Sequence, residues 1–118
     1  MTERGVMLAA ALSAALAVAA GAFGAHGAAS PEAADWLRTG GIYQLVHAVA
    51  AVALASRHPR SAVVMLVGAA LFAVTLYAMA LGAPRWLGAV TPIGGVLMIA
   101  GWICVAWTEL RTHTSPRT

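Results

Sequence analysis

Long apolar runs dominate the chain, and charged residues interrupt them at only a few places. The uncharged stretches between these interruptions are Gly5–Pro31, Thr39–Ser56, Ser61–Pro84 and Trp86–Thr108. A helix needs about 20 apolar residues to cross the hydrocarbon core of a bilayer. Three stretches exceed that length, and the second reaches it if its flanking side chains extend toward the interface. The pattern therefore predicts four transmembrane helices.

The fold class that follows is all-α, an integral membrane up-down four-helix bundle. We expect one domain over residues 1–118, because the short connections make successive helices antiparallel neighbours. Helices and closed barrels alone can span lipid, and these runs are too long and too uniformly apolar for barrel strands. The predicted spans lie near residues 6–26, 40–56, 62–82 and 90–108.

The first connection carries signals for a helix of its own. Ser30 precedes Pro31, the order of an N-cap and a first helical residue. Glu32 and Asp35 follow in the first turns, where negative charge is favourable. These signals predict a short helix over residues 31–38 on the outer membrane surface, with Trp36 at headgroup level.

Composition supports the membrane assignment. The chain is 61% hydrophobic and only 9% charged, whereas an ordinary soluble domain is about 25% charged. The net charge of +3 comes with arginines scattered singly at the ends of apolar runs. Nucleic-acid binding uses a basic patch or stripe, so we expect the bilayer, and no nucleic acid, as the surroundings of this protein.

The arginines also predict an orientation. A cytoplasmic N-terminus places most of them inside, because cytoplasmic loops carry the excess of basic residues. Arg38 and Arg85 then lie outside, and Glu32 and Asp35 carry little weight. The arginines on the inner side are Arg4, Arg57, Arg60, Arg111 and Arg117. Both termini are therefore predicted to be cytoplasmic, in a bacterial inner membrane.

The first apolar run has a second interpretation. A charged start, an alanine-rich stretch and small residues near Ala25–Ala29 are features of a cleaved secretory signal peptide. Against cleavage, Glu3 neutralises Arg4 and leaves the n-region weak. We expect the segment to be retained as the first span.

Small residues predict where helices pack closely. In membranes they let neighbouring backbones approach, either within one chain or across a dimer interface. Four of them recur every four residues in the first span, and three glycines lie in the fourth. The predicted packing residues are Ser13, Ala17, Gly21, Ala25, Gly94, Gly95 and Gly101.

Polar side chains are concentrated in what we expect to be the outer half of the bundle. Such groups are costly in lipid unless they are paired, so they tend to face the interior. The predicted cluster consists of His26, Tyr43, Gln44, His47, Tyr77 and Thr91. Two interpretations stand open. The residues satisfy one another's hydrogen bonds, or they form a site for a quinone, a lipid headgroup or haem.

Other chemistry finds little support. Two histidines on neighbouring helices can ligate haem, but His26 lies nearer the interface than His47. No carboxylate or thiol accompanies them at that depth, so no metal site is predicted, and the cofactor is unknown. Cys104 is a lone thiol and is expected to pack as a small residue. We predict no catalytic residues and no enzyme activity. His58 and His113 are expected to be solvated.

Several motifs together resemble a known family. Gly21 to Gly27 reads GAFGAHG, Trp36 to Gly40 reads WLRTG, and Tyr43 to Ala48 reads YQLVHA. Leu76-Tyr77 follows, and Thr91 to Gly95 reads TPIGG, ahead of Gly101-Trp102. The pattern is similar to the YgdD-like family of small bacterial inner-membrane proteins and to eukaryotic transmembrane protein 256.

The resemblance implies a four-span inner-membrane protein without an assigned function, and it covers nearly the whole chain. Family members usually carry leucine after the first motif, where this chain has Ala28-Ala29, which affects only the packing of the first loop. We expect a non-enzymatic accessory or scaffold subunit that packs with membrane-protein partners or with copies of itself. Ligand binding at the polar cluster is the alternative.

Overall fold

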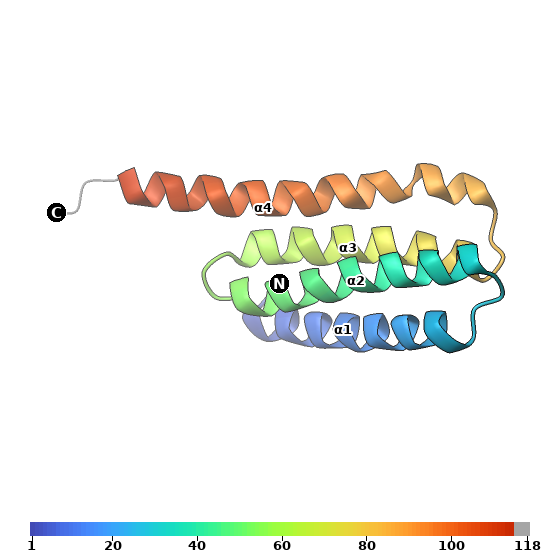
Figure 1. Ribbon diagram of the computed structural model, residues 1–118. Coiled ribbons are helices and arrows are strands. Elements are labelled where there is room, and N and C mark those ends of the chain that lie inside the picture. Colours follow the sequence, from blue (N-terminus) through green and yellow to red (C-terminus); the bar gives the residue numbers. More distant parts are fainter. Residues whose placement is uncertain (115–118) are drawn as a thin grey trace.

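A computed structural model confirms an all-helical architecture with four helices long and apolar enough to cross a membrane (Figure 1). In chain order the elements are α1 (Glu3–His26), α2 (Pro31–Leu54), α3 (Pro59–Ala80), the 3₁₀ helix η1 (Arg85–Ala89) and α4 (Thr91–Thr114). The structure describes residues 1–114, with side chains to residue 112. The predictions for Arg117 and for the His113 side chain fall outside the described part.

The predicted separate surface helix over residues 31–38 is wrong, because α2 runs without a break from Pro31 to Leu54. Its start is as expected: the Ser30 hydroxyl accepts a hydrogen bond from the Ala33 backbone N–H at 3.0 Å. The charged residues Glu32, Asp35 and Arg38 bound the apolar stretch in the sequence, but the helix runs through them. Ala33 and Leu37 face the core, so this segment is an extension of the second span.

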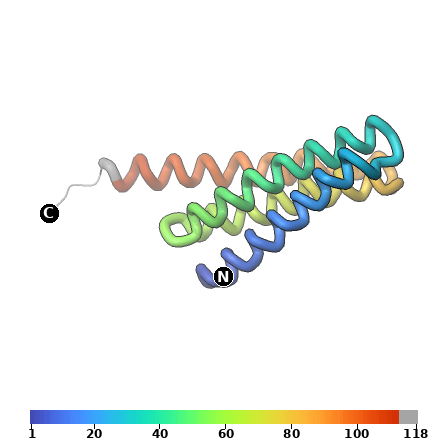
Figure 2. Tube along the Cα trace, turned by 60° about the horizontal axis from the view of Figure 1, so that its bottom comes forward, coloured from blue at the N-terminus to red at the C-terminus, as the bar shows by residue number. Residues whose placement is uncertain are grey.

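The helices form an open row (Figures 1 and 2). α2 packs between α1 and α3, and α4 packs on the other side of α3. Among the described residues, α1 and α4 share no packed interface. Successive helices are antiparallel, as predicted, but the row does not close into a ring. Each end helix therefore keeps a broad apolar surface toward its surroundings.

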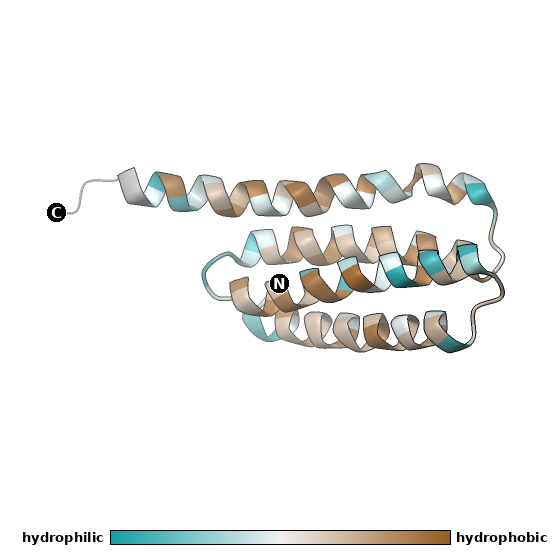
Figure 3. Cartoon of the chain, viewed as in Figure 1, coloured by the Kyte–Doolittle hydropathy of each residue, from teal (hydrophilic) through white to brown (hydrophobic). Residues whose placement is uncertain are grey.

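The core lies among α1, α2 and α3 and is built largely from alanine. Near the N-terminus of α1 the buried cluster consists of Val6, Ala10, Ala51, Ala55, Ala62 and Leu66. Near the other end the cluster consists of Ala20, Ala33, Leu37, Ala73, Tyr77 and Ala80. Small side chains let helix backbones approach closely, which strengthens packing where no hydrophobic effect operates. Hydrophilic residues fall at the helix ends and along part of α2 (Figure 3).

The contact of α4 with α3 depends on glycine. A Cβ added to Gly94 would lie 2.5 Å from both the Gly68 carbonyl oxygen and the Phe72 backbone nitrogen. Gly101 is also buried, and a Cβ there would meet Met65. Two of the three glycines predicted to pack in this span therefore do so. Gly95 does not, since a Cβ on it would meet nothing within 4 Å.

The predicted four-residue ridge on α1 is only partly a packing surface. Ala17 is buried, and Gly21 approaches Gly41 of α2 through its backbone. Ala25 is exposed, and Gly24 is buried in its place. Positions four apart drift by about 40° per step around a helix of 3.6 residues per turn. The ridge therefore starts on the buried face at Ser13 and ends outside it.

Candidate functional site

A hydrogen-bonded chain of three side chains joins α1, α2 and α3. The Tyr77 hydroxyl donates to Gln44 Oε1 at 2.6 Å, and Gln44 Nε2 donates to Ser13 Oγ at 3.1 Å. Two glycines one turn earlier on α2 make room for it. Gly40 faces the Tyr77 ring, and Gly41 faces the Ala17 carbonyl. Gln44 is 2% exposed, so its amide forms hydrogen bonds with protein groups and not with solvent.

His47, one turn further along α2, connects α2 to α4. Its Nδ1 lies 2.7 Å from the Tyr43 carbonyl oxygen, and the Trp102 indole N–H donates to its Nε2 at 3.0 Å. A carbonyl can only accept and an indole N–H can only donate. The partners therefore select the neutral ring with its proton on Nδ1. Both nitrogens are occupied, and neither has a free lone pair for a metal.

A third polar pair joins α3 to α4. Thr75 Oγ1 and Thr91 Oγ1 lie 2.7 Å apart, and both residues are buried. Thr75 also donates toward the carbonyl oxygens of its own helix, as threonine in helices often does. Thr75 and Tyr77 point to different neighbours, as their spacing along α3 requires.

The predicted single cluster is therefore wrong, since four of its six members fall into three separate pairings. Gln44 and Tyr77 meet directly, whereas His47 pairs with Trp102 and Thr91 with Thr75. His26 is exposed at the end of α1 and joins none of them.

Depth also differs from the prediction. Ser13, Gln44 and His47 lie near the middles of α1 and α2. Because α2 begins at Pro31, Gln44 and His47 lie closer to the middle of their helix than the predicted span of residues 40–56 implied.

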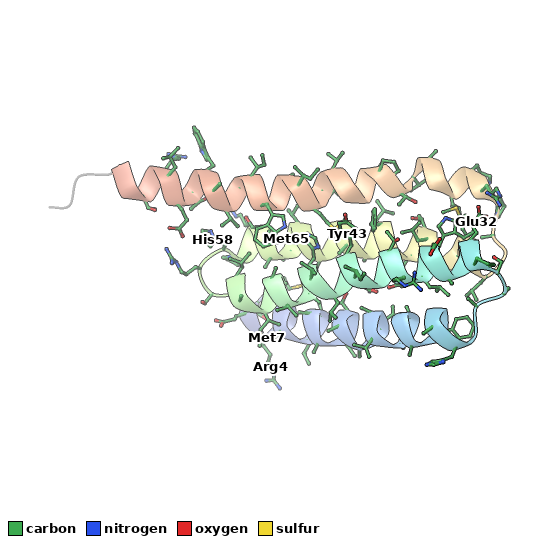
Figure 4. The ribbon with its side chains drawn as sticks, viewed as in Figure 1. Arg4, Met7, Glu32, Tyr43, His58 and Met65 are labelled. Atoms are coloured by element: carbon green, nitrogen blue, oxygen red, sulfur yellow. The ribbon has the colours of Figure 1, made fainter. Side chains whose placement is uncertain are left out.

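Tyr43 is the one predicted site residue that is both aromatic and half-exposed. Its ring stacks on His47 with centroids 6.4 Å apart and tilts against Phe72 at 5.0 Å. Figure 4 shows Tyr43 on the side of α2 toward α3 and α4, whereas Arg4 and Met7 project from the opposite side of the row.

These contacts define what the interior can do chemically. No fully buried side-chain nitrogen or oxygen within the described residues lacks a hydrogen-bond partner. The same part of the chain brings together no group of three or more His, Cys, Asp or Glu side chains. A ligand at the polar residues would have to displace an existing hydrogen bond. The geometry thus favours a structural role for them.

The end of the bundle near the α2–α3 turn corrects another prediction. His58 is 8% exposed rather than solvated. Its Nε2 lies 2.8 Å from Glu109 Oε1 of α4, and Arg57 Nη2 lies 2.6 Å from the same oxygen. Figure 4 shows His58 at this turn, below α4. The contact attaches the far end of α4 to the connection between α2 and α3.

At the opposite end of the bundle, an ion pair joins η1 to α2. Arg85 of η1 pairs with Glu32 at the start of α2, and its guanidinium lies over the Trp36 ring, 5.4 Å from the centroid. Arginine over an indole face is a favourable cation–π arrangement. Trp36 packs partly against the core, so it anchors this end of the bundle from within as well as at the surface.

Comparison with known proteins gives the family. The model for a protein family of unknown function, DUF423, matches residues 20–95. The UPF0382 inner membrane protein YgdD of Escherichia coli K12 is 39% identical over 113 residues, covering 86% of each chain. The chain belongs to the DUF423 family. A UPF0382 membrane protein of Haemophilus influenzae is 38% identical over 114 residues, covering 88% of this chain and 92% of the relative.

A UPF0382 membrane protein of Staphylococcus saprophyticus is 36% identical over 103 residues, 79% of this chain and 86% of its own. No solved structure is significantly similar. The DUF423 segment contains Gln44, His47 and Tyr77 but ends before Trp102 and begins after Ser13. Two of the hydrogen-bond partners thus lie outside the matched segment.

Sequence reasoning missed those two partners and Thr75. A signal existed for Ser13, the only hydroxyl side chain between residues 6 and 26. It falls at the depth of Gln44 only when the second helix begins at Pro31, and a buried amide needs a partner. For Trp102 no such signal exists, because an indole at that position is equally suited to facing lipid.

Proposed function

We propose that this DUF423 protein is a non-enzymatic accessory subunit of the bacterial inner membrane, which packs through α1 against a helix of another membrane protein. The Escherichia coli relative, an inner membrane protein, supports the location in this proposal. The observation that carries the proposal is a stripe of mostly small residues along the exposed side of α1, beside a row of exposed leucines.

This outward face is distinct from the buried face of α1. Its exposed residues follow a spacing of four and three, which keeps them on one side of a helix. They are Ala11, Ala15, Val18, Ala22 and Ala25. A lipid-facing helix gains nothing from alanine over leucine, but a helix–helix contact does, because the backbones can approach. Beside this stripe α1 also exposes Leu8, Leu12 and Leu16. On α4, the exposed residues include Ile99, Ile103 and Trp107.

The paired interior supports the same function. Every predicted site residue except His26 and the Tyr43 hydroxyl has its polar atoms bound within the chain. Such pairing makes a rigid body that offers helix faces rather than a reaction site to its surroundings. We propose with it a cytoplasmic N-terminus and C-terminus, which follow from the positive-inside rule.

The test compares two alanine-to-leucine variants in the native host. Ala15→Leu/Ala22→Leu widens the outward face of α1, and Ala106→Leu makes the same change at an exposed position of α4. After extraction in mild detergent, we expect the unaltered protein and Ala106→Leu to migrate in a complex with a second polypeptide. The α1 variant should migrate alone.

Three results would overturn the proposal. The unaltered protein could run as a lone chain, or the α1 variant could retain the complex. A complex containing only copies of this chain would replace the accessory role by self-association.

A further inference from the structure

A groove runs between α1 and α3 and reaches Ser13, the α1 end of the hydrogen-bonded chain that runs through Gln44 to Tyr77. It opens at the N-terminal end of α3 in a cavity of about 500 Å³, lined by Met1, Pro59, Arg60, Val63 and Val64. A second cavity of about 220 Å³ continues it toward the bundle centre. That cavity is lined by Met1, Ala9, Ser13, Val63, Leu66, Val67 and Ala70. Met1 and Val63 border both cavities, so the two form one continuous groove.

The groove has the dimensions and polarity of an acyl-chain site. From Pro59 to Ala70 it follows α3 for about 16 Å, at 1.5 Å per residue. Apart from the Ser13 hydroxyl and the residues at its mouth, its walls are hydrocarbon. A flexible hydrocarbon chain can fill such a narrow, shallow space.

The mouth of the groove carries an uncompensated positive charge. Three other arginines have acidic partners: Arg38 pairs with Asp35, Arg57 with Glu109 and Arg85 with Glu32. Arg60 is exposed and has no acidic partner among the described residues. It also lies in the first turn of α3, whose N-cap His58 provides no side-chain hydrogen bond. Backbone N–H groups at such a terminus favour an anion.

We propose that this groove binds one anionic phospholipid, with the phosphate at Arg60 and one acyl chain along Val63 and Val67. Basic pockets between transmembrane helices at the cytoplasmic side are suited to anionic headgroups. Charge complementarity selects the lipid class, and the apolar extension of the groove selects a lipid over a free phosphate. This surface is separate from the outward face of α1 proposed for the partner protein.

Native mass spectrometry of the full chain, titrated with palmitoyl-oleoyl phosphatidylglycerol or phosphatidylcholine, tests the headgroup. We expect preferential retention of phosphatidylglycerol and about a fivefold loss of its affinity in Arg60→Gln, equivalent to about 1 kcal/mol. Arg4→Gln removes the same charge from the same end of the bundle, but Arg4 does not line the groove. It should retain the lipid.

The acyl arm is tested separately. Val67→Trp fills the groove, whereas Val74→Trp adds the same side chain to an exposed position of α3 outside it. We expect only Val67→Trp to lose phosphatidylglycerol. Equal retention of the two lipids, equal losses in Arg60→Gln and Arg4→Gln, or unchanged binding in Val67→Trp overturns the proposal. Binding of inorganic phosphate with the same affinity as phosphatidylglycerol would show an anion site without an acyl component and would also overturn the proposal.

Discussion

Both flanks of α3 carry a buried polar pair and a packed glycine, but the shortest contact differs between them. Toward α2, a tyrosine hydroxyl and a buried amide make a 2.6 Å hydrogen bond between helices. Toward α4, glycine at Gly68 and Gly94 brings the two backbones into contact. A polar bond fixes register at one level, whereas a glycine contact depends on the absence of side chains. The α4 flank should therefore be more sensitive to added atoms, and the α2 flank to removed ones.

The largest effect is expected at Gly94. In Gly94→Ala the new methyl meets two backbone atoms at 2.5 Å, and backbone cannot move aside as a side chain end can. We expect a loss of about 3 kcal/mol in the free energy of unfolding, the upper part of the range for overpacking. Unfolding in mixed SDS micelles, followed by tryptophan fluorescence, measures it.

The matched control is Gly95→Ala, one residue further along, where a Cβ meets nothing within 4 Å. It should be neutral or stabilising by up to about 1 kcal/mol through helix propensity. Equal destabilisation by the two variants would show that α4 does not pack as described.

A smaller loss is expected on the α2 flank. Gln44→Leu leaves the Tyr77 hydroxyl without an acceptor, and Tyr77→Phe leaves Gln44 Oε1 without its donor. Interhelical hydrogen bonds in membranes contribute about 0.6 kcal/mol on average and up to about 1.7. The short distance and full burial place this pair at the upper end.

A double-mutant cycle of Gln44→Leu and Tyr77→Phe measures the coupling free energy in the same micelles. We expect about 1.5 kcal/mol. Additive single effects would contradict the account, because they would mean that the two side chains act independently.

Some of these features are predictable from the sequence, and others are not. Apolar length predicts four spans, and small residues predict close packing at Ala17, Gly94 and Gly101. Helix continuity from Pro31 was missed because charge ends an apolar run but does not end a helix. Which polar side chains meet could not be deduced, since it depends on rotation about each helix axis. Residues four apart in sequence are rotated by about 40° around the helix axis, and over several such steps this takes Ala25 off the packed face.

The smallest effect is expected where α2 reaches α4 directly. Trp102→Phe removes the indole donor to His47 Nε2, and the site is partly exposed, with Trp102 at 43%. We expect a loss of about 0.6 kcal/mol, the average for such bonds. Trp107→Phe makes the same change at a more exposed position of α4.

The difference between these two variants measures what the Trp102–His47 hydrogen bond adds to the attachment of α4. A loss in Trp102→Phe that matches the loss in Trp107→Phe would mean that the hydrogen bond to His47 adds nothing to the attachment of α4. The glycine contact and the Thr75–Thr91 pair would then account for it.

We propose that the polar side chains connect helices and leave the lipid-facing sides of the bundle free for a partner protein. Native mass spectrometry of the protein purified from its own membranes tests this most directly, with Gln44→Leu and His47→Leu as variants. We expect a co-purifying polypeptide, and no small molecule whose retention changes in either variant. A bound quinone, haem or other compound that is lost from both variants would contradict it and would make the polar residues a ligand site.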